Sequence, residues 1–346
     1  MPQALVIHNA RDLRLEEVPA EPLGAGQLRI RIVTGGICGS DLHYFQHGGF
    51  GTVRLREPMV LGHEVAGVVM DVGPETAGWT PGLRVAISPS RPCGRCEYCL
   101  RGAPNHCLHM RFYGSAMPWP HIQGAFRQEL VVDAAQAHPV ADEVSDGEAA
   151  LAEPLSVALH AVRRAGPLLG RRVLVTGCGP IGALVVVAAR HAGAGEVVVT
   201  DVTDQTLERA MVLGADRGVN VARDPDGLRA DAADKGRFDV HIEASGQRSA
   251  LLQGFDVLRP RGVIAQVGTG GEVAVPLNVL VAKEFEWRGC FRFHEEFAWA
   301  VQLINGRRVD LTAVISHRVP HRDFARAFEL ALDRRQSLKV QLDFTG

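Results

Sequence analysis

Hydrophobic and polar positions alternate along the first third of the chain. Residues 4–33 read ALVI, LRLEEV and QLRIRIV, with proline- and glycine-containing turns between them. A period of two is typical of short strands whose alternate side chains face a core. The same pattern returns in residues 58–73, 79–87 and 121–132. The sequence therefore predicts a mostly β region of short antiparallel strands.

The pattern becomes helical near residue 142. Residues 142–162, DEVSDGEAALAEPLSVALHAV, have Ala and Leu at helical spacing, and Pro154 suits the first turn of a helix. Further on, apolar strand segments alternate with helical ones; we expect helices near 204–213 and 248–258 and strands near 238–244 and 262–268. This alternation predicts a parallel sheet with helices on both faces, a doubly wound α/β arrangement.

These changes of pattern suggest domain boundaries. A chain of 346 residues has room for about two domains of roughly 150 residues. We expect a mostly β domain over residues 1–150 and an α/β domain over 151–290. The segment 291–346 holds two helical stretches and a last strand, LKVQLDF. We expect it to pack back against the first domain.

Composition excludes several classes of protein. The chain is 46% hydrophobic and 22% charged, as in ordinary globular enzymes, and its net charge of -2 gives no general attraction to nucleic acid or anionic membranes. The longest uncharged apolar run, Ile181–Ala189, is too short to span a bilayer, and the N-terminus does not resemble a signal peptide. We expect a cytoplasmic protein acting on a small molecule. Seven cysteines in such a chain point to metal rather than to disulfides.

Four cysteines form the clearest metal motif. They follow the pattern C-x2-C-x2-C-x7-C, at Cys93, Cys96, Cys99 and Cys107. Four thiolates close a tetrahedral zinc site with no open position, so the motif predicts a structural zinc lobe at about residues 90–110. An iron–sulfur cluster is an alternative. A second alternative is that His106 or His109 replaces Cys107.

A dinucleotide fingerprint lies in the second region. Gly177, Gly179 and Gly182 form G-x-G-x-x-G between the predicted strand RRVLVT and the helix that follows, the context that the motif requires. Such glycines let the backbone approach a pyrophosphate at a helix N-terminus. Asp201, nineteen residues after Gly182, ends the next strand. A carboxylate there accepts ribose hydroxyls and repels a 2′-phosphate, which favours NAD over NADP. The alternative is a glycine turn without a cofactor.

A third group of residues is spread over the first half of the chain. Cys38, His63, Glu64 and Glu153 together offer a thiolate, an imidazole and carboxylates, a set that can hold zinc and leave one position open. The pair at residues 35–36, both glycine, predicts that the preceding strand ends there and that Cys38 lies at a bend. Neighbouring strand residues face opposite sides of a sheet, so His63 and Glu64 share one site only if the backbone twists just before them.

With these motifs in view, the chain resembles the zinc-dependent medium-chain alcohol dehydrogenases over nearly its full length. GGICGSDLH, MVLGHEVAGVV, CGRCEYC, AEPLSVALHA, GCGPIG and GCFRF carry the likeness. Within the family it is most similar to the polyol group, which includes sorbitol and L-idonate dehydrogenases. The resemblance implies a GroES-like β domain, a Rossmann domain, two zinc ions per chain and an NAD cofactor, with NADP possible. It also implies a homo-oligomer, dimer or tetramer.

The resemblance also assigns roles to residues. It makes Cys38, His63 and Glu64 zinc ligands, with Glu153 binding directly or through the metal's water. Ser40 and His43 match the proton relay, in which the nicotinamide ribose takes part. The other matched positions are substrate contacts at Tyr44, Arg292 and Phe293, and cofactor contacts at Pro180, Ile181, Asp201, Val267, Gly268, Thr269, Cys290, Phe291 and Arg292.

The resemblance implies hydride transfer from a secondary alcohol of a polyol or sugar acid. L-idonate is the first expectation and sorbitol or xylitol the alternative. Sorbitol dehydrogenases tend to carry Tyr in place of Phe293 and an arginine in place of Thr206. Arg54 and Arg111 are expected to border the cleft if they are not simply solvated. A zinc-free quinone reductase of the superfamily and a non-catalytic nucleotide-sensing protein are the rival interpretations.

Overall fold

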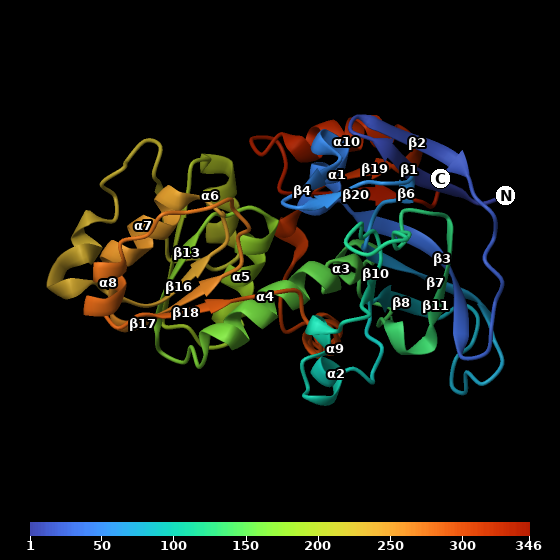
Figure 1. The fold of residues 1–346 in the computed structure, drawn as a ribbon, viewed down its shortest axis with the longest axis horizontal. Coiled ribbons are helices and arrows are strands. Elements are labelled where there is room, and N and C mark those ends of the chain that lie inside the picture. Colours follow the sequence, from blue (N-terminus) through green and yellow to red (C-terminus); the bar gives the residue numbers. More distant parts are fainter.

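The computed structural model describes residues 1–346 as two sheet regions connected by a long helix (Figure 1). The first region is built on a seven-stranded sheet. Its path is β12 (Ala137–Pro139), β8 (Arg84–Ile87), β7 (Glu64–Val72), β3 (Gln27–Gly36), β20 (Lys339–Asp343) and β19 (Ile315–Pro320), and β11 (Glu129–Asp133) also pairs with β3. All pairs are antiparallel except β19 with β20. This confirms the mostly antiparallel β region predicted from alternation.

Smaller elements surround this sheet. A three-stranded sheet has the order β2 (Asp12–Glu17), β1 (Gln3–Asn9) and β6 (Met59–Val60). Two short hairpins pair β4 (Gly49–Phe50) with β5 (Val53–Arg54) and β9 (Ser90–Arg91) with β10 (Arg111–Phe112). The helices of this region are α1 (Gly39–His47), α2 (Glu97–Leu100), α3 (Asp146–Ala150), α9 (Glu296–Asn305) and α10 (Phe324–Leu332).

The expected end of the strand before Gly35 is wrong, because β3 runs through both glycines to Gly36. Their missing side chains serve close packing. A Cβ on Gly35 would lie 2.8 Å from the Phe126 ring, and one on Gly36 would lie 2.2 Å from Glu64 Oε2. Glycine is needed here because neighbouring strands and rings approach the backbone closely. The strand therefore delivers the chain to Cys38 directly beside Glu64.

The second region is a six-stranded parallel sheet. Its order is β15 (Arg217–Asn220), β14 (Glu196–Asp201), β13 (Arg172–Thr176), β16 (Phe238–Glu243), β17 (Leu258–Gln266) and β18 (Glu286–Gly289). Its helices are α5 (Pro180–His191), α6 (Asp204–Val212), α7 (Arg248–Val257) and α8 (Leu277–Ala282). On β13, Val173 and Val175 join the core with α4 and α5, whereas Leu174 joins the core with α7. Helices therefore cover both faces, as predicted, and the fold is of the α/β class.

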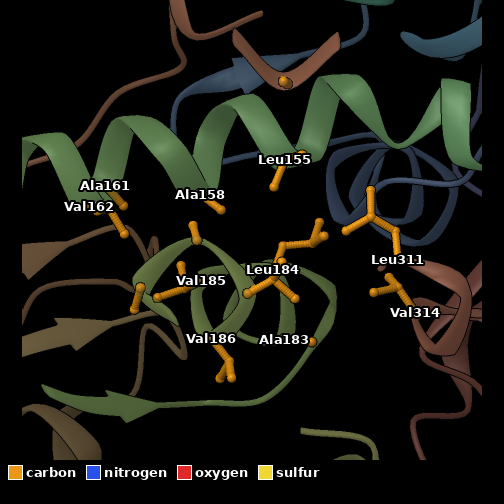
Figure 2. Packing of buried hydrophobic residues seen from close by; sticks show 14 of the residues in the cluster. Leu155, Ala158, Ala161, Val162, Ala183, Leu184, Val185, Val186, Leu311 and Val314 are labelled. Atoms are coloured by element: carbon orange, nitrogen blue, oxygen red, sulfur yellow. The ribbon is translucent and has the colours of Figure 1, made fainter. Parts of the chain in front are cut away.

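The helix α4 (Ala152–Ala165) connects the two regions (Figure 1). Figure 2 shows its apolar face, with Leu155 and Ala158, packed on α5, where Leu184 and Val185 face it. Small alanines let the two helix backbones approach closely. The first turn of α4 holds Glu153, so this packing fixes that carboxylate relative to the parallel sheet.

The predicted helices and strands of the second region are confirmed, except that β17 begins at Leu258, four residues before the expected 262. The division of the chain at residues 150 and 290 stays a prediction, although β20 of the C-terminal segment pairs with β3 of the first region. None of the helices combines the length and apolar composition needed to cross a membrane.

Candidate active site and metal centres

Pairing between β3 and β7 assembles a buried cluster of metal-binding side chains. Cys38 precedes α1, and Glu64, the first residue of β7, lies opposite Gly36. The ligand atoms of Cys38, His63 and Glu64 all lie within 4.8 Å of one another. Residues 25 positions apart in sequence therefore meet because the two strands are antiparallel neighbours.

The predicted twist before His63 is present. Gly62 has a φ of 91°, in the left-handed region that favours glycine. A Cβ there would lie 2.2 Å from the Phe126 ring. The twist turns His63 and Glu64 towards one site although they are consecutive residues. Gly62 is thus required both for its backbone conformation and for its lack of a side chain.

Two buried charged residues that sequence analysis did not select hold this cluster. Asp41 accepts hydrogen bonds from the backbone N–H of Cys38 at 2.9 Å and of Gly62 at 3.1 Å, so one carboxylate joins both ligand segments. Lys339 Nζ donates to both carboxylate oxygens of Glu64, at 2.8 and 2.7 Å, and to the carbonyl of Ile37 at 3.1 Å. The capping-box position of Asp41 was a detectable signal. Nothing local marks Lys339.

Glu153 lies beside the cluster but outside the group of ligand atoms that approach one another within 4.8 Å. Its side chain is buried at the start of α4. Burial raises the pKa of Glu153 to about 8, while the charge of His63 acts in the opposite direction. The carboxyl group is therefore near enough to His63 to act on the site electrostatically.

The cluster has the chemistry of a zinc site. Burial and the Glu64 carboxylate raise the pKa of the Cys38 thiol to about 12. His63 Nδ1 is buried without a hydrogen-bond partner and is 3.9 Å from Asp41 Oδ1. Buried acidic groups outnumber the single lysine, and an orphaned imidazole nitrogen calls for a ligand. Sulfur, nitrogen and carboxylate oxygen are the donors that Zn²⁺ takes, so the residues fit this ion.

The four predicted cysteines also come together. The Sγ atoms of Cys93, Cys96, Cys99 and Cys107 lie within 4.8 Å of one another, and neither His106 nor His109 joins them. The lobe is half exposed, and backbone N–H groups face its sulfurs; Cys93 and His109 donate to Cys107 Sγ at 3.2 and 3.3 Å. Backbone hydrogen bonds at Cys99 and Leu108 lower the pKa of Cys96 to about 6. Four thiols without an open position fit a structural zinc.

The predicted proton relay lies on α1. Ser40 is half-buried and His43, almost one turn later, is exposed. Burial of part of the ring lowers the pKa of His43, and the positive charges of His47 and Arg334 act in the same direction. His43 is therefore neutral near neutral pH and can accept a proton at the surface of the site.

Two of the three expected substrate residues, Tyr44 and Arg292, contact the consecutive residues Ala116 and Met117. Burial lowers the pKa of Arg292 to about 10, and the charges of Glu153 and Tyr44 oppose this shift. The Arg292 guanidinium lies 4.2 Å from the centre of the Phe112 ring, and Tyr44 Oη accepts a hydrogen bond from Ala116 N at 3.0 Å. Arg292 has a φ of 55°, in the left-handed region that few residues other than glycine adopt.

The third expected substrate residue, Phe293, and the two arginines expected to border the cleft are placed differently. Phe293 is only 1% exposed and packs between the rings of Phe112 and Phe297, so it belongs to the core behind the site. Arg54 and Arg111 are exposed. The Arg54 guanidinium donates to the carbonyl groups of its own hairpin. These placements favour the solvated alternative for both arginines.

The glycine fingerprint forms the turn from β13 into α5. Gly177 has a φ of 86°, and a Cβ on Gly182 would lie 1.8 Å from the Gly177 carbonyl oxygen. Pro180 and Ile181 begin the helix after Gly179. Asp201, at the end of β14, accepts from Cys178 N at 2.6 Å and from Val202 N at 2.7 Å. Its carboxylate is thus held at the edge where dinucleotides bind parallel sheets.

The remaining predicted cofactor residues follow neighbouring strands at the same edge. Val267, Gly268 and Thr269 follow β17, and Cys290 and Phe291 follow β18. Glu243, a buried residue that sequence analysis missed, accepts from Ser245 N at 2.8 Å and from Gly246 N at 3.0 Å. It orders the loop behind Gly268, where a Cβ would lie 2.2 Å from Gly246 N.

Comparison with known proteins places these sites in context. The family model described as alcohol dehydrogenase GroES-like domain matches residues 24–142, and that described as zinc-binding dehydrogenase matches residues 180–306. L-idonate 5-dehydrogenase (NAD(P)(+)) of Escherichia coli is 40% identical, over 99% of this chain and 98% of its own. Sorbitol dehydrogenase of Gallus gallus is 35% identical, over 98% and 95%. The crystal structure of E. coli L-idonate 5-dehydrogenase matches with a TM-score of 0.95, over 99% and 98% of the two chains.

Proposed function

We infer that this chain, which belongs to the zinc-binding alcohol dehydrogenase family, oxidises L-idonate to 5-ketogluconate and passes a hydride to NAD. The chain is a zinc-dependent, NAD(P)-dependent alcohol or polyol dehydrogenase. The substrate within that class is our proposal. It rests mainly on one observation: the Arg292 guanidinium lies 4.2 Å from the centre of the Phe112 ring, and the same ring packs against His63 of the Cys38–His63–Glu64 cluster.

The proposed oxidation removes two hydrogens from one secondary alcohol. The C–H bond breaks and its electron pair leaves as hydride to the nicotinamide, while the hydroxyl proton leaves to solvent. Cys38, His63 and Glu64 would hold zinc, with Glu153 beside it. Zinc bound there supplies Lewis-acid chemistry, lowering the pKa of a coordinated hydroxyl.

The chain's own residues then orient the substrate and move its proton. Ser40 is half-buried near Cys38 and would accept the proton first, and the exposed His43 would release it to water. His43 suits this task because its lowered pKa keeps it neutral and able to accept. Apolar walls, including Phe112 beside His63, would exclude water from the reacting centre.

Arg292 would bind the substrate carboxylate. A guanidinium can hold a carboxylate through two parallel hydrogen bonds, and it does so best where water is scarce. Arg292 is half-buried over the Phe112 ring, and its Nη2 contacts only the weakly polar sulfur of Met117, at 3.3 Å. The donors of the guanidinium are therefore available to an anionic substrate. With its carboxylate held by Arg292, L-idonate would present C5, at the far end of the molecule, to the Cys38–His63–Glu64 cluster.

A substrate panel tests this proposal. We expect kcat/KM for L-idonate to exceed that for sorbitol in the wild type, and Arg292→Leu to reduce idonate turnover far more than sorbitol turnover. Arg292→Lys, which keeps charge but loses the two-pronged geometry, is the matched control. Sorbitol turnover above idonate turnover in the wild type would refute the sugar-acid assignment. It would favour the alternative of a sorbitol- or xylitol-type polyol dehydrogenase, which the similarity to sorbitol dehydrogenases supports.

We further propose that NAD is the preferred cofactor. Asp201 would accept the adenosine ribose hydroxyls and oppose a 2′-phosphate. The comparison of kcat/KM for NAD and NADP in wild type and Asp201→Ala measures this directly. A wild-type preference for NADP would contradict it.

The assembly and its location are also proposals. The edge strand β18 has no partner on its outer side and carries Trp287, which is 39% exposed; Leu277 and Val281 of α8, the helix before this strand, are 65% and 70% exposed. We propose that a second copy covers this edge in a homo-oligomer, because an unpaired apolar edge favours strand pairing. The molecular mass in solution tests this, and Trp287→Asp should yield monomers. Seven free cysteines support a reducing compartment, the cytoplasm.

A further inference from the structure

A small cavity at the adenosine end of the proposed cofactor site is lined by three arginines from two parts of the chain. Gln205, Thr206 and Arg209 come from α6, and Arg334 and Arg335 come from the loop after α10. The cavity has a volume of about 100 Å³. This is well above the roughly 10–15 Å³ that one water molecule needs. It can therefore hold a group of several atoms.

The lining is cationic and contains no carboxylate. None of its three arginines forms an ion pair, whereas the nearby Arg223 pairs with Asp204 and Arg318 pairs with Asp343. Asp333, the acidic residue next to the loop, has its carboxylate engaged by Arg335 N at 3.0 Å and Gln336 Nε2 at 2.6 Å. Because positive charge gathers here without a protein partner, an anion is the ligand that the cavity favours.

The cavity lies close to the residue that marks the adenosine ribose. Asp201 accepts a hydrogen bond from Thr203 N at 3.0 Å, and Thr203 accepts one from Thr206 Oγ1 at 2.8 Å. Thr206, which lines the cavity, is thus two hydrogen bonds away from the Asp201 carboxylate. Thr206 lies in the first turn of α6, five residues after Asp201.

The loop that carries Arg334 and Arg335 also approaches His43 of the proposed proton relay. The charge of Arg334 acts on His43, the residue of the proposed relay next to the nicotinamide ribose. Figure 1 shows the chain after α10 extending from the first sheet region towards α6. Residues 334–338 therefore face the N-terminal half of α6 across one cavity, on the side of the molecule where Asp201 ends β14.

We propose that this cavity accepts the 2′-phosphate of NADP, with Arg334 and Arg335 as its cations. The residues immediately after Asp201, Val202 to Thr206, include no arginine. Here the missing cation comes from the opposite side of the cleft. The proposal rests on the dehydrogenase function and deepens it: NAD remains the better cofactor because of Asp201, and NADP is also used because a separate anion site offsets the repulsion.

Binding of two nucleotides tests the assignment without any turnover. The dissociation constants of adenosine 2′,5′-bisphosphate and of ADP are measured by calorimetry for the wild-type zinc-loaded enzyme, Arg334→Gln, Arg335→Gln and the double variant. A charge-assisted hydrogen bond to phosphate is worth about tenfold or more in affinity. We expect the double variant to lose at least about tenfold for the 2′,5′-bisphosphate and less than about twofold for ADP.

Two further variants test whether the effect is specific to the charge inside the cavity. Arg326→Gln removes an exposed arginine of α10 outside the cavity and should change neither constant. Gln205→Glu adds a carboxylate to the cavity wall and should weaken 2′,5′-bisphosphate binding selectively, without removing any contact of the loop. Melting temperatures of all variants check that the fold is intact.

The other outcomes overturn the proposal. Equal losses for both nucleotides would mean that the arginines serve the pyrophosphate, and unchanged constants would mean that the cavity binds neither. Failure to oxidise idonate would leave this test unaffected, since it needs no substrate. In turnover assays, the double variant should raise KM for NADP about tenfold and leave KM for NAD nearly unchanged.

Discussion

The two cysteine-containing metal centres differ most in their surroundings. In the first, His63 and Glu64 are buried, and Lys339 and Asp41 lie behind them. In the second, four half-exposed or buried cysteines receive backbone hydrogen bonds and have no buried charged partner. The same ion would therefore meet a desolvated cavity with an excess of acidic groups in one place and a closed sulfur cage at the surface in the other. Burial and an open position permit chemistry, whereas a closed set of thiolates permits only folding.

Loss of the buried centre should have the largest effect. We expect Cys38→Ser to reduce kcat at least about 10³-fold, because Lewis-acid catalysis contributes several kcal/mol and each 1.36 kcal/mol is a factor of ten. The melting temperature should change little. Measurements of zinc content and kcat check this. A Cys38→Ser variant that keeps half the wild-type rate would contradict a catalytic role for the buried centre.

Removal of the buried cation Lys339 should lower the free energy of unfolding more than any substitution in the four-cysteine lobe. Lys339→Met leaves Glu64, which is 1% exposed, without its ion pair. Removing one partner of a buried pair costs about 3–5 kcal/mol. Urea unfolding of the metal-free protein measures the loss. The double variant Lys339→Met/Glu64→Leu should recover much of it, and no recovery would show that the lysine acts by other contacts.

Metal removal should reveal a contribution of the buried Glu153 to the pH dependence of stability. Burial raises the pKa of Glu153 from 4.5 to about 8. The folded state then holds a proton that the unfolded state has lost, so stability is fully present below pH 4.5 and declines as pH rises to 8. The slope reaches about 1.4 kcal/mol per pH unit. Unfolding of metal-free wild type at several pH values checks this. Between pH 4.5 and 8, metal-free Glu153→Gln should lose less stability than the metal-free wild type.

The lobe should contribute to stability rather than to turnover. Cys96→Ser opens the four-thiolate site, and we expect it to lower the free energy of unfolding by about 1–3 kcal/mol while losing one zinc. The kcat of the Cys96→Ser molecules that remain folded should fall less than tenfold. Thermal unfolding and zinc analysis measure these effects. An unchanged melting temperature with unchanged zinc content would remove the structural role.

One contact connects the lobe to the substrate site and sharpens the contrast. Asn105 Nδ2 donates to the Phe291 carbonyl at 3.0 Å, and the next residue is Arg292. Loss of such a hydrogen bond costs about 1 kcal/mol. Asn105→Ala should therefore raise KM for idonate a few-fold, with kcat and zinc content little changed. Leu108→Ala, an exposed position of the same lobe, is the control and should leave KM unchanged.

The contrast also explains what could be predicted from sequence. The four-cysteine lobe is local: its first and last ligands are fourteen positions apart in the sequence, so their spacing alone indicates the site. The buried centre depends on strand pairing, so the sequence could group Cys38 with Glu153 only by donor chemistry, and the family resemblance gave them their roles. Lys339 reaches Glu64 across 275 positions because β20 and β7 both pair with β3. No local pattern carries that information.

The mistaken strand end at Gly35 has a related cause. Glycine lowers strand propensity, and this local preference suggested a bend. In the folded protein, Phe126 and Glu64 occupy the space beside Gly35 and Gly36, and this packing outweighs the propensity. Phe293, matched to a substrate contact by resemblance, has its ring packed between Phe112 and Phe297, and its contact with substrate stays a prediction. Tertiary contacts decided both positions.

Anomalous X-ray scattering at the zinc edge, from crystals of the active enzyme, tests the two-centre account most directly. We predict two peaks per chain. One should lie about 2.3 Å from Cys38 Sγ and about 2.0–2.1 Å from a ring nitrogen of His63, with a position left for water or substrate. The other should lie about 2.3 Å from all four lobe sulfurs. An active crystal without a peak beside Cys38, or with a closed set of four protein ligands there, would contradict the account.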